Sequence, residues 1–523
     1  MAINLSYVTF TDQDDIIPLS GVEDIGIYLG TVNTLAGDDI INGGNNVIID
    51  TVTGALLTDA GNFSNAASTI NTNSGNDLIT GTYNRIDLYH SYPRGAITNS
   101  SPPDEGYATI NTGEGNDTIT GIFNDLKDSY VGNGIYNVRA TIDTSDGNDI
   151  ITGIGSSYGI LTEITTIDTG KGDDIITAIG GDTGIDSRVN TTINTGDGND
   201  IITATGDSGW GILLLSGTID TGEGNDIING TGGVSGLVFR TADFSDVRSR
   251  VNTGEGDDII TGTGSEDGIT SDYIDTGNGD DTISGTASKY GLSSGYIDTG
   301  NGDDIISGTG SEYGLSSGYI DTGNGDDIIS GTGSESGLLS DYINTGNGDD
   351  TISGTGSQRG IVNYNTIETG EGNDIITSIG VIYNEGVINT GNGNDSIIAE
   401  GTGTGYGIYN NGGAVLTGDG NDSIISNEGF ESAENSSGSW FLGEGEDYIK
   451  GFGSGDFYGG NGNDTLELTP GTYTVGIWGE GGESPIFTKG DQLMITSEFE
   501  KLKAGSTIYN FTSLTAGQII IVA

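Results

Sequence analysis

A six-residue turn of the form Thr-Gly-x-Gly-[Asp/Asn]-Asp is the constellation in this sequence whose residue types could do chemistry. Its two glycines permit positive φ, so the backbone can curl with carbonyl oxygens facing inward, and the final aspartate adds a carboxylate. Oxygen atoms of these two kinds are the ligands that Ca²⁺ prefers, usually about six to eight at a time. One turn cannot supply that number, whereas two turns stacked in successive coils can.

The final aspartate of the turn recurs along most of the chain, with a period of 23 residues in the stretch whose copies begin at Tyr273, Tyr296 and Tyr319. A fixed period in this range is typical of a solenoid. The sequence therefore predicts a column of calcium ligands, made of Asp39, Asp77, Asp117, Asp149, Asp174, Asp200, Asp226, Asp258, Asp281, Asp304, Asp327, Asp350, Asp374, Asp395, Asp422, Asp447 and Asp464.

The same turn residues allow two other interpretations. Glycine-aspartate turns also occur without metal, as Asx-turns, but a column of aspartates about 5 Å apart would be strongly unfavourable without cations. Adjacent carboxylates such as Asp303 and Asp304 are also the groups of a glycosidase. Their repetition in every coil favours ion binding over catalysis.

The elements that position these turns are predicted from three recurring apolar positions in each coil. They lie seven residues before the aspartate (Ile274), two after it (Ile283) and nine further on (Leu292). The residue directly after the aspartate varies, as in Thr282 and Ile305, because alternate side chains of a strand point to opposite faces. The pattern predicts an all-β, right-handed parallel β-helix or β-roll with about 23-residue coils, none of which is stable alone.

Composition and charge exclude several classes of protein. The net charge of −61 disfavours nucleic acid and anionic membranes as partners. The chain has 96 glycines but only 6 prolines and lacks a Gly-X-Y period, which excludes collagen, and it has no cysteine for disulfides or thiolate metal sites. The first ten residues have no signal-peptide character, and apolar runs such as Ile519–Ala523 are too short for membrane insertion.

The repeat resembles the calcium-binding nonapeptide G-G-x-G-x-D-x-U-x of the repeats-in-toxin (RTX) family. Residues Thr299 to Ser307 match it with Thr in place of the first Gly, and the resemblance covers about residues 70–465. It implies that Asp304 and Asp327, with alternate carbonyls of their two turns, hold one ion. Family members often have two such turns in a coil; here the opposite turn, Gly308 to Ser311, lacks the aspartate, so we expect one calcium column.

We expect three parts: an N-terminal cap at 1–33, the repeat array at 34–465, and a C-terminal cap at 466–523. The last part also resembles the C-terminal segments of cyanobacterial RTX-like surface proteins, in which an uncleaved C-terminal signal serves type I secretion. This implies a secreted, extracellular protein at a cell surface. The strand-like ends, Ile3 to Phe10 and Ile519 to Val522, either meet between subunits as a fibre or keep the chain monomeric.

The interpretation that the sequence favours is a structural protein of the cell exterior, an S-layer, sheath or fibre subunit, that binds itself or cell-surface polysaccharide. Repeats fill the chain, so no module is left for an enzyme, and an RTX-associated exoenzyme is disfavoured. An adhesin or carbohydrate-binding module is the alternative. RTX-type ice-binders resemble this fold but carry Thr at the x position of the turn, where this chain has Asn301, Asn324, Glu371 and Lys171, among others, so ice binding is disfavoured.

Two further features of the sequence are candidate sites. The tyrosines before the inward isoleucines, Tyr273, Tyr296, Tyr319 and Tyr342, are expected to form an outward ladder, either simple stacking or a contact surface for sugar or a neighbouring chain. The single histidine, His90, lies in an insertion, and one loop histidine does not make a hydrolytic triad.

Overall fold

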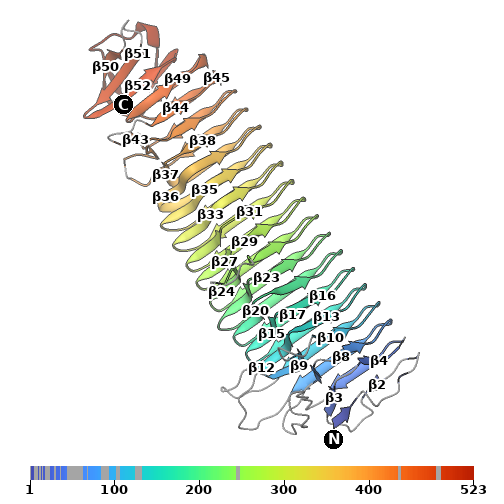
Figure 1. Cartoon of the computed structure of the whole chain (residues 1–523). Coiled ribbons are helices and arrows are strands. Elements are labelled where there is room, and N and C mark those ends of the chain that lie inside the picture. The colour runs from blue at the N-terminus through green and yellow to red at the C-terminus, as the bar shows by residue number, and fades with distance from the viewer. Residues whose placement is uncertain are drawn as a thin grey trace. The chain divides into compact units, whose positions relative to one another are not determined.

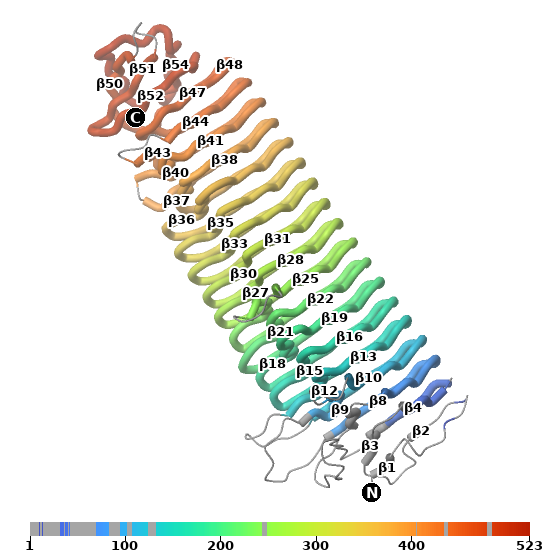
Figure 2. The backbone as a smooth tube through the Cα atoms, in the orientation of Figure 1, coloured from blue at the N-terminus to red at the C-terminus, as the bar shows by residue number. Residues whose placement is uncertain are grey.

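The structure is a computed structural model. It describes residues 94–523 apart from 102–106, 124–131, 243–247, 404, 434–437 and 479–483, and before residue 94 it describes 2–4, 10, 13, 16–17, 24–28, 31–35, 37–43, 63–66 and 69–83. The chain divides into two compact units, Met1–Ala287 and Ser288–Ala523. The described residues contain strands and no α-helix, and within each unit successive coils pair in parallel (Figures 1 and 2), which confirms the predicted all-β parallel solenoid.

Each coil of the first unit contributes three strands, one to each of three parallel ladders. We call the ladder whose strands follow the aspartate turn A, the next B, and the ladder before the turn C. The A strands are β2(Ile16–Ile17), β5(Ile40–Gly43), β8(Leu78–Tyr83), β11(Thr118–Phe123), β14(Ile150–Gly155), β17(Ile175–Gly180), β20(Ile201–Gly206), β23(Ile227–Gly232), β26(Ile259–Gly264) and β29(Thr282–Ala287).

The other two ladders of the first unit follow the same order. The B strands are β1(Ala2–Asn4), β3(Asp24–Tyr28), β6(Phe63–Ala66), β9(Arg94–Ser100), β12(Gly132–Val138), β15(Tyr158–Glu163), β18(Thr183–Ser187), β21(Trp210–Leu215), β24(Ser235–Arg240) and β27(Asp267–Ser271). The C strands are β4(Thr31–Asn33), β7(Thr69–Asn71), β10(Ala108–Asn111), β13(Ala140–Asp143), β16(Thr165–Asp168), β19(Thr191–Asn194), β22(Thr218–Asp220), β25(Arg250–Asn252) and β28(Ile274–Asp275).

The second unit repeats this plan, although some of its strands run through a corner and join two ladders. They are β30(Tyr290–Ser294), β31(Ile297–Asp298), β32(Ile305–Thr309), β33(Tyr313–Asp321), β34(Ile328–Thr332), β35(Ser336–Asn344), β36(Thr351–Glu368), β37(Ile375–Asn384), β38(Val387–Asn389), β39(Ser396–Ala399), β40(Ile408–Asn410), β41(Ala414–Leu416), β42(Ser423–Ser426), β43(Phe430–Ser432), β44(Ser439–Phe441), β46(Tyr448–Lys450), β47(Gly455–Tyr458) and β49(Thr465–Leu468). The short strands β45(Glu444–Gly445) and β48(Asn461–Gly462) pair with each other inside two turns.

The core of each unit contains the aliphatic side chains that the periodicity placed inside. Ile274 and Ile283 in the first unit and Leu292 in the second are at most 1 % exposed. Ile305, directly after an aspartate, is 40 % exposed. The predicted alternation of side chains is therefore confirmed, and it points the turn aspartates inward while their neighbours face out.

One predicted loop is in part a strand. The interval from Asp77 to Asp117 is longer than the 23-residue period, which predicts that Asp87 to Gly106 leave the coil as a loop, but β9(Arg94–Ser100) pairs in register with β12. Its buried Ala96 and Ile97 supply the inward apolar residues that a B strand needs. The interval from Asp226 to Asp258 is also longer than the period, and there β24 ends at Arg240 and β25 begins at Arg250.

The chain after Thr465 departs from the parallel plan. Strands β50(Gly471–Trp478), β51(Ser484–Lys489), β54(Thr507–Asn510) and β55(Ile519–Val522) make antiparallel pairs. Two strands between them, β52(Gln492–Ser497) and β53(Lys501–Ala504), pair in parallel with β47 and β49 and so extend the C and A ladders by one strand each. The part boundaries at residues 34 and 466 stay predictions, and most of the segment from Ile3 to Phe10 lies outside the described residues.

Candidate metal centre

The turn between each C strand and the next A strand holds the predicted ligands. All seventeen predicted aspartates lie in these turns, and each is at most 2 % exposed. They are Asp39, Asp77, Asp117, Asp149, Asp174, Asp200, Asp226, Asp258 and Asp281 in the first unit, and Asp304, Asp327, Asp350, Asp374, Asp395, Asp422, Asp447 and Asp464 in the second. The solenoid thus lines up within each unit the carboxylates that are far apart in sequence. Their role as ligands stays a prediction.

Glycine is required in these turns because the backbones of successive turns touch. Gly222 and Gly224 have φ values of +92° and +138°, which residues with a Cβ rarely adopt. A Cβ on Gly224 would lie 1.8 Å from the carbonyl oxygen of Gly198 in the preceding coil. The same contact recurs along the array, so the turns stack closely enough to share an ion.

A ladder of hydrogen bonds fixes one oxygen of each aspartate. The backbone N–H of Asp200 donates to Oδ1 of Asp226 at 2.8 Å, and the N–H of Asp226 donates to Oδ1 of Asp258 at 2.7 Å. The same bond, 2.7–2.9 Å long, joins successive aspartates from Asp39 to Asp281 and from Asp304 to Asp464. Each coil therefore orients the carboxylate of the next.

The other carboxylate oxygen is buried and, for most of these aspartates, has no donor in good hydrogen-bond geometry among the described residues, although the hydroxyl of the turn threonine lies near the carboxylate. The aspartates with such an Oδ2 atom include Asp77, Asp117, Asp149, Asp174, Asp200, Asp226 and Asp258 in the first unit and Asp350, Asp395, Asp422, Asp447 and Asp464 in the second. In two coils a threonine hydroxyl donates to Oδ2 at 2.5 Å, Thr322 to Asp327 and Thr369 to Asp374. A buried carboxylate oxygen without a donor is costly, so a repeated row of them fits turns that bind a cation.

Burial also raises the pKa of these carboxyl groups. It raises the pKa of Asp117 to about 6, of Asp174 to about 7 and of Asp226 to about 8, and the nearby turn threonines and backbone N–H groups lower it by less. Charge on neighbouring aspartates of the ladder adds to the effect for Asp174 and Asp226. Without a cation, the column would therefore take up protons near neutral pH.

The donor set of the turns fits calcium. It contains carboxylate and carbonyl oxygens and neither imidazole nor thiolate, as a hard cation requires. Within the described ranges, no three His, Cys, Asp or Glu side chains come together as a metal cluster. That is consistent with a site in which one or two carboxylates are completed by backbone carbonyls. The buried, stacked aspartates thus have the arrangement of calcium-binding turns.

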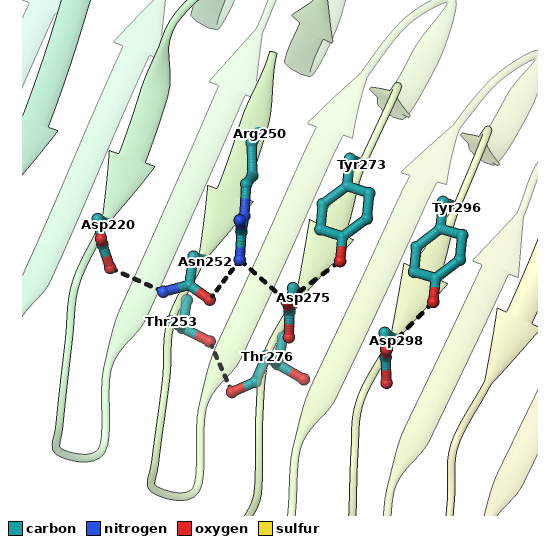
Figure 3. A network of polar contacts seen from close by, with 9 residues as sticks. All are labelled: Asp220, Arg250, Asn252, Thr253, Tyr273, Asp275, Thr276, Tyr296 and Asp298. Atoms are coloured by element: carbon teal, nitrogen blue, oxygen red, sulfur yellow. Dashed lines mark hydrogen bonds and ion pairs between the residues drawn. The ribbon is translucent and has the colours of Figure 1, made fainter. Parts of the chain in front are cut away.

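Acidic side chains on the outward surface of the C strands differ from the buried column, because they have donors (Figure 3). Asp275 accepts hydrogen bonds from Arg250 at 3.1 Å and from the Tyr273 hydroxyl at 3.2 Å. Asp220 accepts one from the Nδ2 amide of Asn252 at 2.8 Å. Within this part of the structure, satisfied surface carboxylates and unsatisfied buried ones lie in separate columns.

One residue of the ladder was missed by the sequence analysis. The N–H of Asp464 donates to Oε2 of Glu500 at 2.7 Å, as each earlier N–H donates to the next aspartate. Lys501 N–H then bonds to the Asp464 carbonyl at 2.9 Å, which matches the bond from Thr465 to Asp447. Glu500 thus occupies the aspartate position of one more turn, between β52 and β53. Because this turn lacks the glycine motif, only the register of the paired strands reveals it.

The predicted tyrosine ladder is present in the second unit. The rings of Tyr296 and Tyr319 stack at 4.6 Å between centroids, and those of Tyr319 and Tyr342 at 4.8 Å. The hydroxyl of Tyr319 donates to Asp321 at 3.0 Å. Both faces of the Tyr319 ring are therefore covered by neighbouring rings. His90 lies outside the described residues.

Comparison with known proteins adds little to this picture. No family model and no curated protein matches the chain. One matching solved structure is a hyperactive, Ca²⁺-dependent, β-helical antifreeze protein from an Antarctic bacterium, at 15 % identity over 97 % of this chain and 96 % of that one, with a TM-score of 0.27. A likeness this weak supports no conclusion about a ligand. Over the described residues, no helix has the length and apolar character needed to span a membrane.

Proposed function

We propose that this chain is a secreted, calcium-stabilised structural protein of the cell exterior, an S-layer, sheath or fibre subunit. The observation that carries the proposal is the column of buried aspartates whose Oδ2 atoms have no donor. Bound Ca²⁺ would supply the positive charge that a stack of buried carboxylates lacks. The seventeen turn aspartates are the proposed ligands, each shared by the ions on its two sides.

The array would use calcium as a staple between coils. Asp226 and Asp258, together with carbonyl oxygens of their turns, would hold one ion, and the hydrogen bond between them already sets their spacing. Because a solenoid is stabilised by contacts between neighbouring repeats, each ion would strengthen one such contact. The protein would then hold its shape where calcium is abundant, as it is outside cells.

We propose a structural rather than a catalytic role, since the repeated chemistry of the chain is that of the turns. Membership of the RTX family and export through a C-terminal type I signal belong to the same proposal, which rests on the resemblance of the turn and of the C-terminal segment. Residues 1–33 and 466–523 would cap the array. Parallel pairing of β52 with β47 and of β53 with β49 supports the C-terminal cap.

Binding of carbohydrate is the weaker alternative for the tyrosine ladder. Sugars stack on the faces of aromatic rings, but the faces of Tyr319 are covered by Tyr296 and Tyr342 at 4.6 and 4.8 Å. The hydroxyl of Tyr319 is also taken up by Asp321. These contacts favour a ladder that stabilises the coils.

The experiment that tests the proposal is the calcium content of the purified chain. Bound calcium would be measured at equilibrium, by dialysis against about 5 mM CaCl₂ and atomic emission on both sides of the membrane, next to a sample in which Asp226, Asp258 and Asp350 are each changed to Asn. We expect many ions per chain and fewer in the triple variant. A wild-type chain that carries no calcium would exclude the proposed function.

A further inference from the structure

The outward surface of the A strands in the first unit carries no charged side chain. In the eight strands from β8 to β29, the first, third and fifth residues face out, and all of them are Ile, Leu, Thr, Ser or Asn. Charged residues make up 17 % of the chain, so about four would be expected among these positions. We call this surface the A face.

The absence of charge is particular to the A face. On the outward surface of the C strands of the same unit, Asp143, Asp168, Asp220 and Asp275 end four strands, and Arg250 begins another. An exposed sheet surface in a soluble protein is ordinarily polar and charged. In a chain with a net charge of −61, a broad neutral surface therefore calls for an explanation.

The side chains of the A face form straight columns. The strands pair in register, so that Ile150 lies beside Ile175, and Thr177 beside Thr203. Ile150, Ile175 and Ile259 are 36–39 % exposed although each belongs to an apolar residue type. The face is therefore a regular array in which the side chains within each isoleucine or threonine column follow one another at the strand spacing of about 4.8 Å.

We infer that the A face binds the A face of a second copy of this chain. The inference rests on the proposed function, for which it supplies the contact between subunits. Two chains of charge −61 repel each other, and the repulsion and the cost of removing charges from water are smallest where neither surface carries a charge. A second copy also presents the same column spacing, so the ridges of one face can pack between those of the other over its whole length.

The size of the face suits a specific dimer. Eight strands about 4.8 Å apart and five residues of about 3.3 Å each cover roughly 650 Å² per copy, or about 1,300 Å² in total. Specific interfaces bury about 1,200–2,000 Å². The same surface on both partners makes the contact isologous, which gives a closed pair. Pairing through the A face differs from a head-to-tail contact between chain ends.

The test is sedimentation velocity of the full chain in about 5 mM calcium, with one charge placed in the middle of the face. Thr203→Glu and Thr203→Lys alter the third residue of β20, and Thr192→Glu is the matched control on β19 of the C ladder. Thr192 and Thr203 are both half-buried and face outward. Far-UV circular dichroism checks that each variant folds.

We expect a wild-type dimer, at least a tenfold weaker dimer for both Thr203 variants, and no change for Thr192→Glu. The lysine variant separates the two possible causes, since a general attraction of cations to an acidic chain would make its dimer tighter. A folded wild-type monomer in calcium, as a face for neutral polysaccharide would give, overturns the inference. So does equal weakening by Thr203→Glu and Thr192→Glu. A β spectrum that persists in chelator counts against the calcium role alone.

Discussion

Replacing one buried aspartate by asparagine should change the stability of its neighbourhood in opposite directions with and without calcium. Asp226→Asn keeps an oxygen that can accept the Asp200 N–H, 2.8 Å away in the wild type, and removes the negative charge. Without calcium, the variant no longer buries a carboxyl whose pKa burial raises to about 8, so it should be at least as stable as wild type above pH 8. With calcium, it lacks a ligand of two ions.

The stability that Asp226→Asn loses in the presence of calcium follows from the number of ions that Asp226 would bind. A site of affinity about 0.1–1 mM, typical of extracellular calcium modules, contributes about 1–2.3 kcal/mol at 5 mM calcium. Asp226 faces Asp200 on one side and Asp258 on the other. Loss of two sites should therefore cost about 2–5 kcal/mol, confined to adjacent coils because solenoid repeats contact only their neighbours.

Native-state hydrogen exchange measures this loss coil by coil. Amide protection in β20, β23 and β26 should fall in 5 mM calcium, while that of β14 should stay at the wild-type level. Asp257→Asn is the matched control: it removes the same charge from the exposed residue beside Asp258, and asparagine can still accept the Asp280 N–H. Unchanged protection in Asp226→Asn, or an equal loss in Asp257→Asn, would refute the reasoning.

Three further predictions concern pH, the end of the ladder and the turn glycines. Because burial raises the folded-state pKa of carboxyls such as Asp226 above the unfolded value, protonation stabilises the calcium-free fold fully below about pH 4 and the effect is lost as pH rises through about 6–8. In chelator, the chain should therefore keep more β structure by far-UV circular dichroism at pH 5 than at pH 8, and equal β content would count against it. Glu500→Ala should reduce the hydrogen-exchange protection of β53 in calcium, because it removes the acceptor of the Asp464 N–H. Glu500→Gln can still accept that N–H, so it should reduce the protection only if Glu500 also binds the cation. If neither change has an effect, Glu500 has no part in the ladder. Gly224→Ala should disrupt its coil even in saturating calcium, since the new Cβ would lie 1.8 Å from the Gly198 carbonyl oxygen, and a calcium titration identical to wild type would contradict this.

The parallel solenoid could be predicted because two independent patterns agree. The aspartate turn recurs at a constant distance from inward residues such as Ile274 and Ile283, and both are buried as the period required. When the local pattern and the global fold agree in this way, the fold of a repeat sequence can be predicted. The site aspartates could be located for the same reason, since the turn proposed to bind the cation is also the turn that closes the coil.

What the sequence did not reveal depends on pairing between strands. Glu500 has no glycine turn around it, and only the pairing of β53 with β49 places it on the aspartate ladder. Ala96 and Ile97 lie in an insertion of unusual length, so their strand could not be separated from a loop by the repeat alone. The neutral A face likewise becomes visible only when residues about two dozen positions apart are set side by side.

The most direct test of the calcium column is the far-UV circular dichroism spectrum of the full chain at pH 7.5, in about 5 mM calcium and in excess chelator, both at low salt. We predict a β-rich spectrum in calcium, its loss in chelator, and recovery on adding calcium but not sodium chloride of the same ionic strength. A β-rich spectrum and an unchanged melting temperature in chelator would contradict a fold stabilised by calcium at its stacked aspartates.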